Sequence, residues 1–324
     1  MNTVTATIVV PTFNRLNELM ITLDSLVNQN CKYPFEVIVV DDGSAEDTKS
    51  VINQYMDKLE LKYCFQEDKG FRAAAARNMG IELARGEICI FIDNGIILHS
   101  KAIEEHIDTH LNVADPCVVL GYVYGLDIDK EDEQLLHDII ANNSPAEAIE
   151  ISKNKQFYDL RETYYKELGD DLSKWPAPFV ICWGGNLSIS TKVLIEVGMF
   201  DESYTTWGEE DVDLGVALFK NNVKYILSRK ACGIHYPHIK AHNWDSQKKI
   251  TTDEFHKNMM KKQGDNAVSV DVASLLVLFS NKKEHAILEN KKKYMAKKYS
   301  IKEIEFWMKY WDPVELNKAL MQLD

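Results

Sequence analysis

Short apolar runs alternate with segments of helical spacing over the first part of the chain. Runs typical of buried strands cover Thr7 to Val10, Phe35 to Val40, Leu61 to Phe65 and Glu87 to Ile92. Segments with apolar residues at helical spacing lie between them, at Arg15 to Asn28, Ala45 to Leu59 and Arg72 to Ala84. Alternation of this kind implies right-handed crossovers. The pattern therefore predicts an α/β fold with a Rossmann-like, doubly wound, mostly parallel sheet.

Polar residues follow three of these strands at the point where each strand ends. They are Pro11-Thr12-Phe13-Asn14-Arg15, Asp41-Asp42-Gly43-Ser44 and Asp93-Asn94-Gly95. In a doubly wound sheet, ligands bind beyond the carboxyl ends of the strands. An ordinary turn and helix cap would also account for the Asp41 to Ser44 segment. Two adjacent aspartates at that edge are more than a turn requires, so we expect a ligand site there.

The regular alternation stops after a helix at Lys101 to Leu111 and a strand at Cys117 to Leu120. Residues from about 127 to 175 are acidic, helical in propensity and interleaved with aromatic residues. This composition predicts a helical insertion, which is either a lid or acceptor wall over the site or plain packing. Regular elements are then expected at Leu187 to Ile189 (strand), Thr191 to Val197 (helix), Asp211 to Lys220 (helix) and Lys224 to Leu227 (strand).

The C-terminal part of the chain differs from the rest. Past about residue 245 it is rich in lysine and carries large apolar residues such as Phe306, Trp307 and Trp311. We expect one domain at residues 1–245 and a C-terminal helical extension at residues 246–324. The extension would pack on the domain, form a homo-oligomer contact, or offer a basic amphipathic surface for peripheral contact with anionic membranes.

The overall composition excludes several classes of protein. The 324 residues are 45% hydrophobic and 27% charged, as in a globular protein. A net charge of −13 argues against a nucleic-acid binder. The 6 cysteines are spread singly, without the spacings of a zinc site or the density of a disulfide scaffold. Because no apolar run approaches the length of a membrane span, we expect a cytoplasmic protein, either free or peripheral at the membrane.

A dense group of carboxylates lies late in the chain. Within the segment from Trp207 to Gly215, the residues Glu209, Glu210, Asp211 and Asp213 are all acidic. An acidic helix start is one explanation, because carboxylates in a first turn complement the helix dipole. A cation, the hydroxyl groups of a ligand or a proton-transfer task are the others. The neighbouring tryptophan, unusual at a solvated helix tip, favours a ligand site.

Four ordered motifs carry a resemblance to a known family. They read IVVPTFNR at residues 8–15, VIVVDDGS at residues 37–44, AARNMGI at residues 75–81 and WGEED at residues 207–211. Together they resemble the family 2 type glycosyltransferases, which have the GT-A nucleotide-diphospho-sugar transferase fold, over about residues 5 to 240. The last motif is most similar to that of inverting enzymes, such as bacterial polysaccharide polymerases and galactosyltransferase-like enzymes.

The resemblance implies a site for a nucleotide-sugar, most plausibly a UDP-sugar. Asp41 or Asp42 would accept the imino hydrogen of uracil, and Arg77 would approach the diphosphate or pair with Asp93. A surface helix arginine is the plain alternative for Arg77, and Arg72 is a weaker candidate for the diphosphate. The implied nucleotide-sugar-binding residues are Pro11, Thr12, Arg15, Asp41, Asp42, Arg77, Asp93, Asn94 and Gly185.

The resemblance also implies a divalent metal ion, Mn²⁺ or Mg²⁺. The family's Asp-X-Asp triplet corresponds here to Asp93-Asn94-Gly95, and Gly95 has no side chain to bind a metal. The metal ligands would then be Asp93, perhaps aided by Asn94, together with His235 or His238, a set that suits Mn²⁺. A capped turn or core packing is the alternative for the two histidines.

For catalysis, the resemblance implies Asp211 as the base that takes the proton of the acceptor hydroxyl. Glu210 would hold the acceptor hydroxyls or serve as the alternative base. Trp207 would offer an apolar face to an acceptor sugar, unless it packs in the core. The Glu-Asp pair favours inversion over retention at the anomeric carbon.

The predicted function is therefore an inverting hexosyl- or N-acetylhexosaminyl-transferase. Its acceptor would be a glycan, a lipid-linked molecule, a peptide or a small molecule, in polysaccharide, glycoconjugate or natural-product glycosylation. The alternative, motivated by Gly95, is a catalytically degenerate scaffold that still binds a nucleotide-sugar. A nucleotidyltransferase is less suitable, because the first strand is not followed by a glycine-rich, basic phosphate loop.

Overall fold

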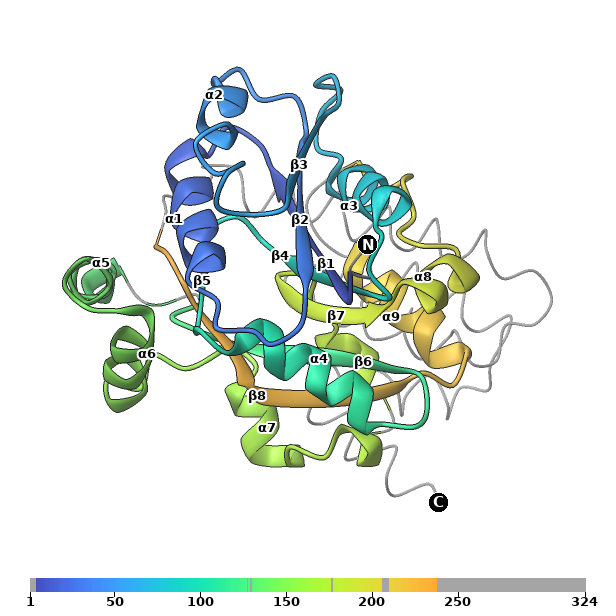
Figure 1. The fold of residues 1–324 in the computed structure, drawn as a ribbon. Coiled ribbons are helices and arrows are strands. Elements are labelled where there is room, and N and C mark those ends of the chain that lie inside the picture. The colour runs from blue at the N-terminus through green and yellow to red at the C-terminus, as the bar shows by residue number, and fades with distance from the viewer. Residues whose placement is uncertain (1–3, 127, 129, 176, 206–209, 238–324) are drawn as a thin grey trace, which may run out of the picture.

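One mixed sheet organises the chain. The computed structural model describes residues 4–126, 128, 130–175, 177–205 and 210–237. Within them, eight strands form a single sheet in the order β3-β2-β1-β4-β7-β6-β8-β5 (Figure 1). The predicted C-terminal extension at 246–324, and the boundary before it, lie outside the described residues.

The N-terminal half of the sheet is parallel, as predicted. Its strands are β1 (Ala6–Thr12), β2 (Phe35–Asp41), β3 (Leu61–Phe65) and β4 (Ile88–Ile92). Val9 on β1 joins the apolar cluster on one face of the sheet, whereas Ile8 and Val10 join the cluster on the other. This alternation explains the continuous β-branched run, because a parallel sheet covered by helices is buried on both faces.

Helices connect these strands. They are α1 (Leu16–Val27), α2 (Thr48–Ile52) and α3 (Ala73–Leu83). The predicted helix from Ala45 to Leu59 is wrong in length. Asp47 caps the start of α2 by accepting a hydrogen bond from the Ser50 amide, but after Ile52 the chain continues in three-residue turns instead of a helix.

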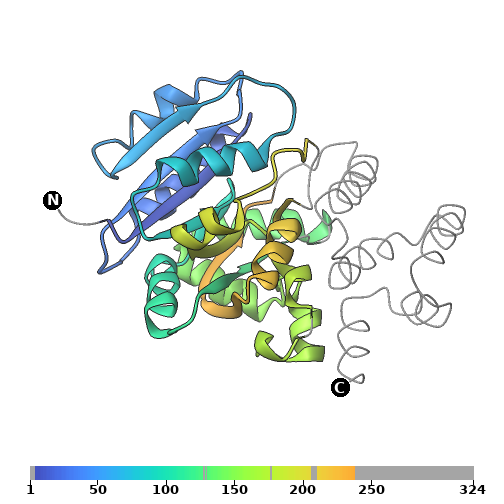
Figure 2. The ribbon, with the colours of Figure 1, turned by 90° about the vertical axis from the view of Figure 1, so that its right-hand side faces the viewer.

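The second half of the sheet departs from a purely doubly wound pattern. Strand β7 (Asn186–Ser190) runs antiparallel between β4 and β6 (Cys117–Tyr124), and β8 (Lys224–His235) pairs in parallel with β6. A short strand that the sequence did not predict, β5 (Ile96–Leu98), follows Gly95 directly and pairs antiparallel with β8. Figure 2 shows the blue N-terminal strands above these later elements. The sheet is therefore mostly parallel at its N-terminal end and mixed beyond β4.

The later helices cover this half of the sheet. They are α4 (Ala102–Asn112), α8 (Thr191–Val197) and α9 (Glu210–Lys220). These bounds confirm the predicted helices within a residue at each end. Strand β8 is longer than predicted, because it continues from Leu227 through His235 to pair with β5.

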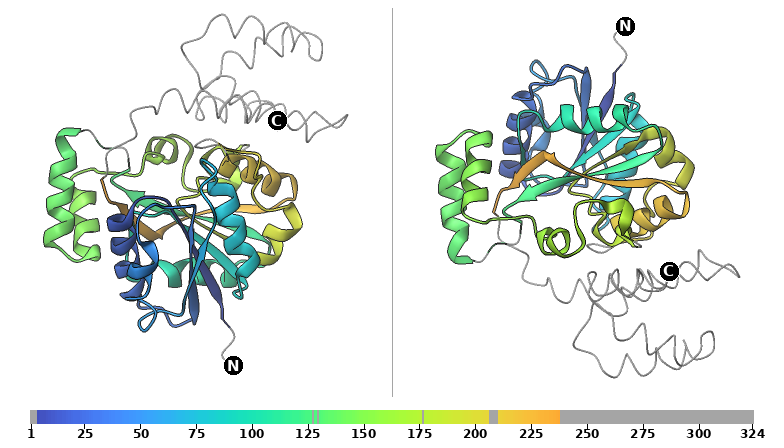
Figure 3. Two further views of the ribbon diagram at one scale, coloured as in Figure 1. Left: turned by 90° about the horizontal axis from the view of Figure 1, so that it is seen from above. Right: turned by 90° about the horizontal axis from the view of Figure 1, so that it is seen from below.

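The predicted helical insertion lies between β6 and β7. It comprises α5 (Lys130–Asn142), α6 (Pro145–Asn154), α7 (Glu162–Leu168) and the 3₁₀ turns η1 (Leu172–Lys174) and η2 (Pro178–Ile181). Helices α5 and α6 lie together at one side of the molecule (Figure 3). Phe157, Tyr165 and Trp175 are buried in the same apolar cluster as β6 and β7. These aromatic residues therefore serve core packing. Within the described part of the chain, no helix has both the length and the apolar character to cross a membrane.

Candidate active site

The two aspartates after β2 are both held by hydrogen bonds. The buried Asp41 accepts from the Ser44 amide at 2.7 Å and from the Tyr63 hydroxyl at 2.9 Å. Burial, and secondarily the Asp41 carboxylate, raises the pKa of Tyr63, so this hydroxyl stays a proton donor. Asp41 thus has the turn-forming role that the sequence left open, at the carboxyl edge of the sheet where a ligand would bind.

Asp42 is held by the segment that follows β3. Its carboxylate accepts from Gln66 Nε2 at 2.5 Å and from the Arg72 amide at 2.9 Å, and the Arg72 guanidinium lies 3.4 Å from it. The structure therefore pairs Arg72 with Asp42. Gly43 follows the two aspartates with φ +92°, and an added Cβ there would be 2.3 Å from the Asp68 backbone nitrogen. The close approach explains why glycine is required there.

Three further predicted residues meet at the end of β1. The Asn94 amide nitrogen donates to Thr12 Oγ1 at 2.7 Å and to the carbonyl oxygen of Arg15 at 3.0 Å. Asn94 is 8% exposed, and its Oδ1 atom has no hydrogen-bond partner among the described residues. Pro11 is half-buried beside Val40 in the β1–β2 ladder. Among the described residues, the side-chain oxygen Oδ1 of Asn94 is thus an acceptor without a partner at the predicted ligand edge.

Arg77 joins two parts of the site that are far apart in sequence. From α3, its Nη1 donates to Glu210 Oε1 at 2.7 Å and its Nη2 donates to Asp93 Oδ1 at 3.0 Å. The side chains of Arg77 and Glu210 are each 5% exposed, whereas that of Asp93 is 45% exposed. Burial opposes the charge on Arg77, but Asp93, Glu210 and Asp211 raise its pKa, so it stays a cation. The predicted pairing with Asp93 is confirmed; the pairing with Glu210 was not foreseen.

A pair of glycines connects the two predicted reaction centres. Asp211, in the first turn of α9, accepts from the Gly184 amide at 2.8 Å and from the Val212 amide at 2.8 Å. The carbonyl oxygen of Gly185 accepts from the Asp93 amide at 2.9 Å. A Cβ on Gly184 would lie 3.1 Å from the Arg77 guanidinium, and one on Gly185 would lie 3.2 Å from Asp93 Oδ2. The turn therefore needs two small residues. The predicted site residues include Gly185 but not Gly184, whose amide binds Asp211.

The described residues include some, but not all, of the predicted metal ligands. His235 ends β8 opposite Ile96, and the next residue, Tyr236, donates its amide to the carbonyl oxygen of Gly95 at 2.8 Å. The backbone of His235 thus runs beside the Asp93-Asn94-Gly95 segment. Among the described residues, no group of three His, Cys, Asp or Glu side chains is arranged to hold a metal. His238 and Trp207 lie outside those residues. Half-exposed Asp93 and the unpartnered Asn94 Oδ1 still fit a hard, oxygen-seeking cation.

Two family models match the sequence, and one of them covers more than half of the chain. The model described as glycosyl transferase family 2 matches residues 7–187. The chain belongs to glycosyl transferase family 2. A model described as the N-terminal domain of galactosyltransferase matches residues 168–242. The two matches overlap at residues 168–187, which include the Gly184–Gly185 pair.

Curated relatives of this family member include enzymes whose names refer to different molecules. It is 36% identical to validoxylamine A glucosyltransferase of Streptomyces hygroscopicus subsp. jinggangensis over 237 residues, which are 72% of this chain and 56% of the relative. It is 38% identical to hyaluronan synthase of Pasteurella multocida over 227 residues, 66% of this chain and 22% of the relative. The chain thus spans about half of the first relative and about a fifth of the second.

Solved structures confirm the predicted GT-A fold. Staphylococcus aureus TarS 1-349 in complex with UDP-GlcNAc matches with a TM-score of 0.59 and 17% identity, over 94% of this chain and 78% of that one. The mannosyltransferase PcManGT from Pyrobaculum calidifontis, in complex with GDP-Man and Mn²⁺, matches with a TM-score of 0.53 and 17% identity, over 98% of this chain and 86% of that one. At this identity the likeness concerns the fold of the glycosyltransferase alone.

Proposed function

We propose that the chain is an inverting glycosyltransferase that moves a sugar from a UDP-sugar to a hydroxyl group of a sugar or sugar-like acceptor. The observation that carries the proposal is the joining of Asp93, Glu210 and Asp211 through Arg77 and the Gly184–Gly185 turn. This arrangement holds a half-exposed carboxylate at the donor end of the sheet close to a second carboxylate at a helix start. Inverting transfer needs such a pair of functions, one at the leaving group and one at the acceptor.

The environments of Glu210 and Asp211 favour Asp211 as the base. Glu210 is 4% exposed and forms an ion pair with Arg77, so it has little access to an acceptor. Asp211 is half-buried, and its carboxylate accepts hydrogen bonds from the backbone amides of Gly184 and Val212. These amides orient the carboxylate, which is more accessible than that of Glu210. We therefore assign proton removal to Asp211, and assign to Glu210 and Arg77 the positioning of the acidic motif.

The reaction conserves atoms and charge. The acceptor oxygen attacks the anomeric carbon, its proton passes to Asp211, and the bond between that carbon and the diphosphate oxygen breaks, so UDP leaves with the electron pair. Direct displacement of this kind inverts the anomeric configuration. The base Asp211 must lie on the acceptor side of the sugar, and the Gly184 amide that binds its carboxylate fixes it there relative to the sheet edge.

Asp41, Asp42, Thr12 and Arg15 form the proposed nucleotide end of the site. The GT-A structure of TarS was solved with UDP-GlcNAc, which supports the choice of a uridine nucleotide. A divalent cation, Mn²⁺ or Mg²⁺, would be held by Asp93, with Asn94 Oδ1 and either His235 or His238 as further ligands, and would neutralise charge on the departing diphosphate. PcManGT was solved with Mn²⁺, in line with this proposal. Within the chain, Arg77 would keep Asp93 oriented for this role.

The test is a panel of UDP-, GDP-, CDP- and dTDP-sugars, each with Mn²⁺, Mg²⁺ or EDTA. Binding is followed by thermal shift and calorimetry, since a ligand of the folded state raises its apparent stability. Turnover is followed as release of nucleotide in the presence of aminocyclitol and oligosaccharide acceptors, and the anomer of the product is read by NMR. We expect one UDP-sugar to bind and be turned over with inversion. Binding without turnover under every condition would instead support the scaffold that Gly95 suggests.

A further inference from the structure

The residues that flank the Gly184–Gly185 turn make contacts of their own, apart from the hydrogen bonds of the turn with Asp93 and Asp211. Its neighbours in sequence, Ile181 and Trp183 before it and Asn186 after it, all contact buried polar groups from other elements. The family resemblance and the metal and nucleotide sites do not involve these groups. One of these groups is a buried charged side chain, and its presence beside the turn needs an explanation.

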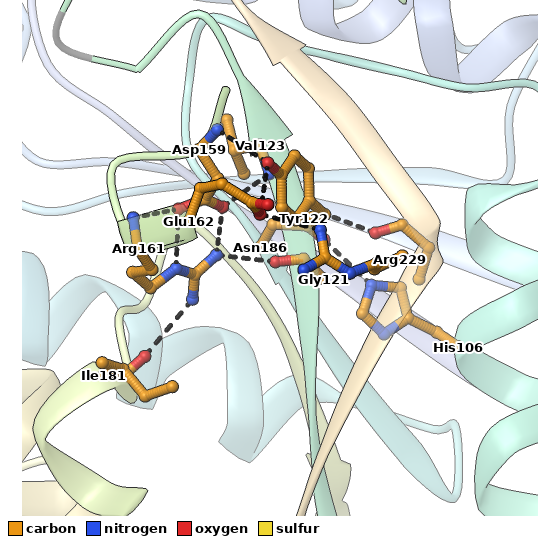
Figure 4. A network of polar contacts seen from close by, with 11 residues as sticks. His106, Gly121, Tyr122, Val123, Asp159, Arg161, Glu162, Ile181, Asn186 and Arg229 are labelled. Carbon is orange, nitrogen blue, oxygen red and sulfur yellow. Dashed lines mark hydrogen bonds and ion pairs between the residues drawn. The ribbon is translucent and has the colours of Figure 1, made fainter. Parts of the chain in front are cut away.

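Arg161, at the start of α7, is the centre of these contacts. Its guanidinium donates from Nε to Asp159 Oδ1 at 2.9 Å and from Nη2 to Asp159 Oδ2 at 2.7 Å, and the two side chains are 2% and 0% exposed. The Nη2 atom also donates to the carbonyl oxygen of Gly121 at 2.7 Å, and Nη1 donates to that of Ile181 at 3.3 Å. Figure 4 shows the guanidinium between these groups. Arg161 therefore ties β6 to the end of η2.

The same guanidinium also contacts the residue directly before the turn. Its central carbon lies 5.4 Å from the centroid of the Trp183 ring, and the indole nitrogen donates to the carbonyl oxygen of Val180 at 3.2 Å. A buried cation over an indole face is a favourable contact. Since Trp183 precedes Gly184, fixing the ring also restricts the direction of the Gly184 amide, which binds Asp211.

Asn186 fixes the other end of the turn. Its amide nitrogen donates to the carbonyl oxygen of Ala231 on β8 at 3.0 Å, and its Oδ1 is 2.9 Å from His106 Nε2 on α4. Because Oδ1 can only accept, His106 carries its proton on Nε2, and His106 Nδ1 then accepts from the Ser188 hydroxyl at 2.9 Å. Because the nitrogen and the oxygen of the Asn186 side-chain amide both form hydrogen bonds, this side chain cannot rotate without breaking a buried hydrogen bond.

A gain in the stability of the fold does not by itself explain the buried Arg161–Asp159 ion pair. A buried ion pair is often no more stabilising than well-packed apolar residues, although removal of one partner is costly. Gly121 lies where the β6–β8 register shifts, so its carbonyl oxygen needs a partner outside the ladder, and Arg161 supplies it. The five-donor fork of arginine can bind one carboxylate and two carbonyl groups at once, which lysine cannot do. The contacts thus specify geometry at η2 and the turn.

We propose that Arg161 and Asn186 are positioning residues for catalysis, which hold the Gly184–Gly185 turn so that the Gly184 amide orients Asp211 and the Gly185 carbonyl orients Asp93. The proposal rests on the function proposed above for Asp211 and Asp93. Neither residue touches the reacting atoms in this scheme. Loss of the fork would let the turn shift, and a shift of about 1 Å in a reacting group can lower a rate about a hundredfold.

The primary test is Arg161→Lys, which keeps a cation beside Asp159 but loses the fork. With the UDP-sugar that the wild type turns over, measured well below the melting temperature, we expect kcat to fall about tenfold to a hundredfold while KM for the donor changes less than about threefold. The matched control is Arg85→Lys, the same change at the Arg85–Glu36 pair at the amino end of the sheet. It should leave kcat unchanged. An unchanged kcat in Arg161→Lys would overturn the proposal.

A second variant separates the loss of positioning from misfolding caused by an unpaired buried charge. The double change Asp159→Asn with Arg161→Met removes both buried charges, so no unpaired charge remains, and it should fold yet show the same loss of kcat. A double variant with wild-type kcat would also contradict the proposal.

An activity-independent measurement separates this proposal from the proposed function. Amide hydrogen exchange at Gly184 and Asp93 reports the two hydrogen bonds of the turn directly. We expect faster exchange at both amides in Arg161→Lys and not in Arg85→Lys. Should the wild type turn over no nucleotide-sugar, the proposed function fails, whereas unchanged exchange in Arg161→Lys rejects the positioning role itself.

Discussion

Glu210 and Asp211 are adjacent in sequence but occupy different environments, and this difference predicts different costs of mutation. Glu210 pairs with the buried Arg77, so Glu210→Ala removes the buried partner of that cation and leaves the more exposed Asp93 as its ion-pair partner among the described residues. Breaking a buried pair costs about 3–5 kcal/mol of the free energy of unfolding. Urea denaturation should show this loss in Glu210→Ala and a smaller one in Asp211→Ala. Equal losses would mean that the Arg77–Glu210 pair does not hold α9 in place.

Asp93 is the carboxylate most open to a ligand at the donor end of the site. Its Oδ1 binds Arg77, but the side chain is 45% exposed. We expect Asp93→Ala to weaken binding of UDP by at least about tenfold when Mn²⁺ is present, and to change it little in EDTA. Calorimetry with and without chelator checks this. The control is Asp108→Ala, which removes a carboxylate on α4 that contacts Lys32 and Tyr33. Equal affinity of wild type and Asp93→Ala for UDP and Mn²⁺ would reject the metal assignment.

At the scale of the elements, α4 is joined to β6 and β7 by a buried chain of hydrogen bonds. His110 Nε2 contacts the Ser188 hydroxyl at 2.9 Å, and His110 Nδ1 contacts Cys117 Sγ at 3.4 Å. With His106 on the same hydroxyl, both rings are satisfied in their neutral forms. Burial lowers the pKa of His106 and of His110 to about 4.

These buried, neutral histidines predict how the free energy of unfolding depends on pH. The unfolded histidines have a pKa of about 6.5, so between that value and about 4 the unfolded state binds more protons. Stability is therefore full above about pH 6.5 and falls as the pH is lowered towards 4, by roughly 3 kcal/mol for each histidine. Urea midpoints between pH 7 and pH 4.5 measure the slope, which should be shallower in His106→Asn. An identical slope in that variant would contradict the buried neutral state.

At the scale of the whole molecule, local patterns predicted the parallel half of the sheet and most helices. The sequence itself indicates the burial of β1, β2 and β4, because these strands are largely apolar on both faces. The antiparallel direction of β7 and the strand β5 depend on pairing with distant segments, so no local pattern contains them. The motifs gave a pairing of Arg77 with Asp93 as one of two possible roles for that arginine, and the structure contains the pair. The contact of Arg77 with Glu210, 133 residues away, and the contacts of Arg161 with the turn exist only in the assembled fold.

The most direct test of the account compares the wild type with Asp211→Asn. The asparagine keeps the size of the side chain and can still accept the Gly184 amide, but it cannot take a proton at the pH of the reaction. Donor affinity is measured by calorimetry with the UDP-sugar that the wild type turns over, and transfer is measured as product formed in the presence of acceptor. We predict an affinity within about twofold of the wild type and a kcat lower by a factor of about 10³ or more. A variant that retains transfer, or that loses donor binding in step with transfer, would contradict the assignment of Asp211 as the base.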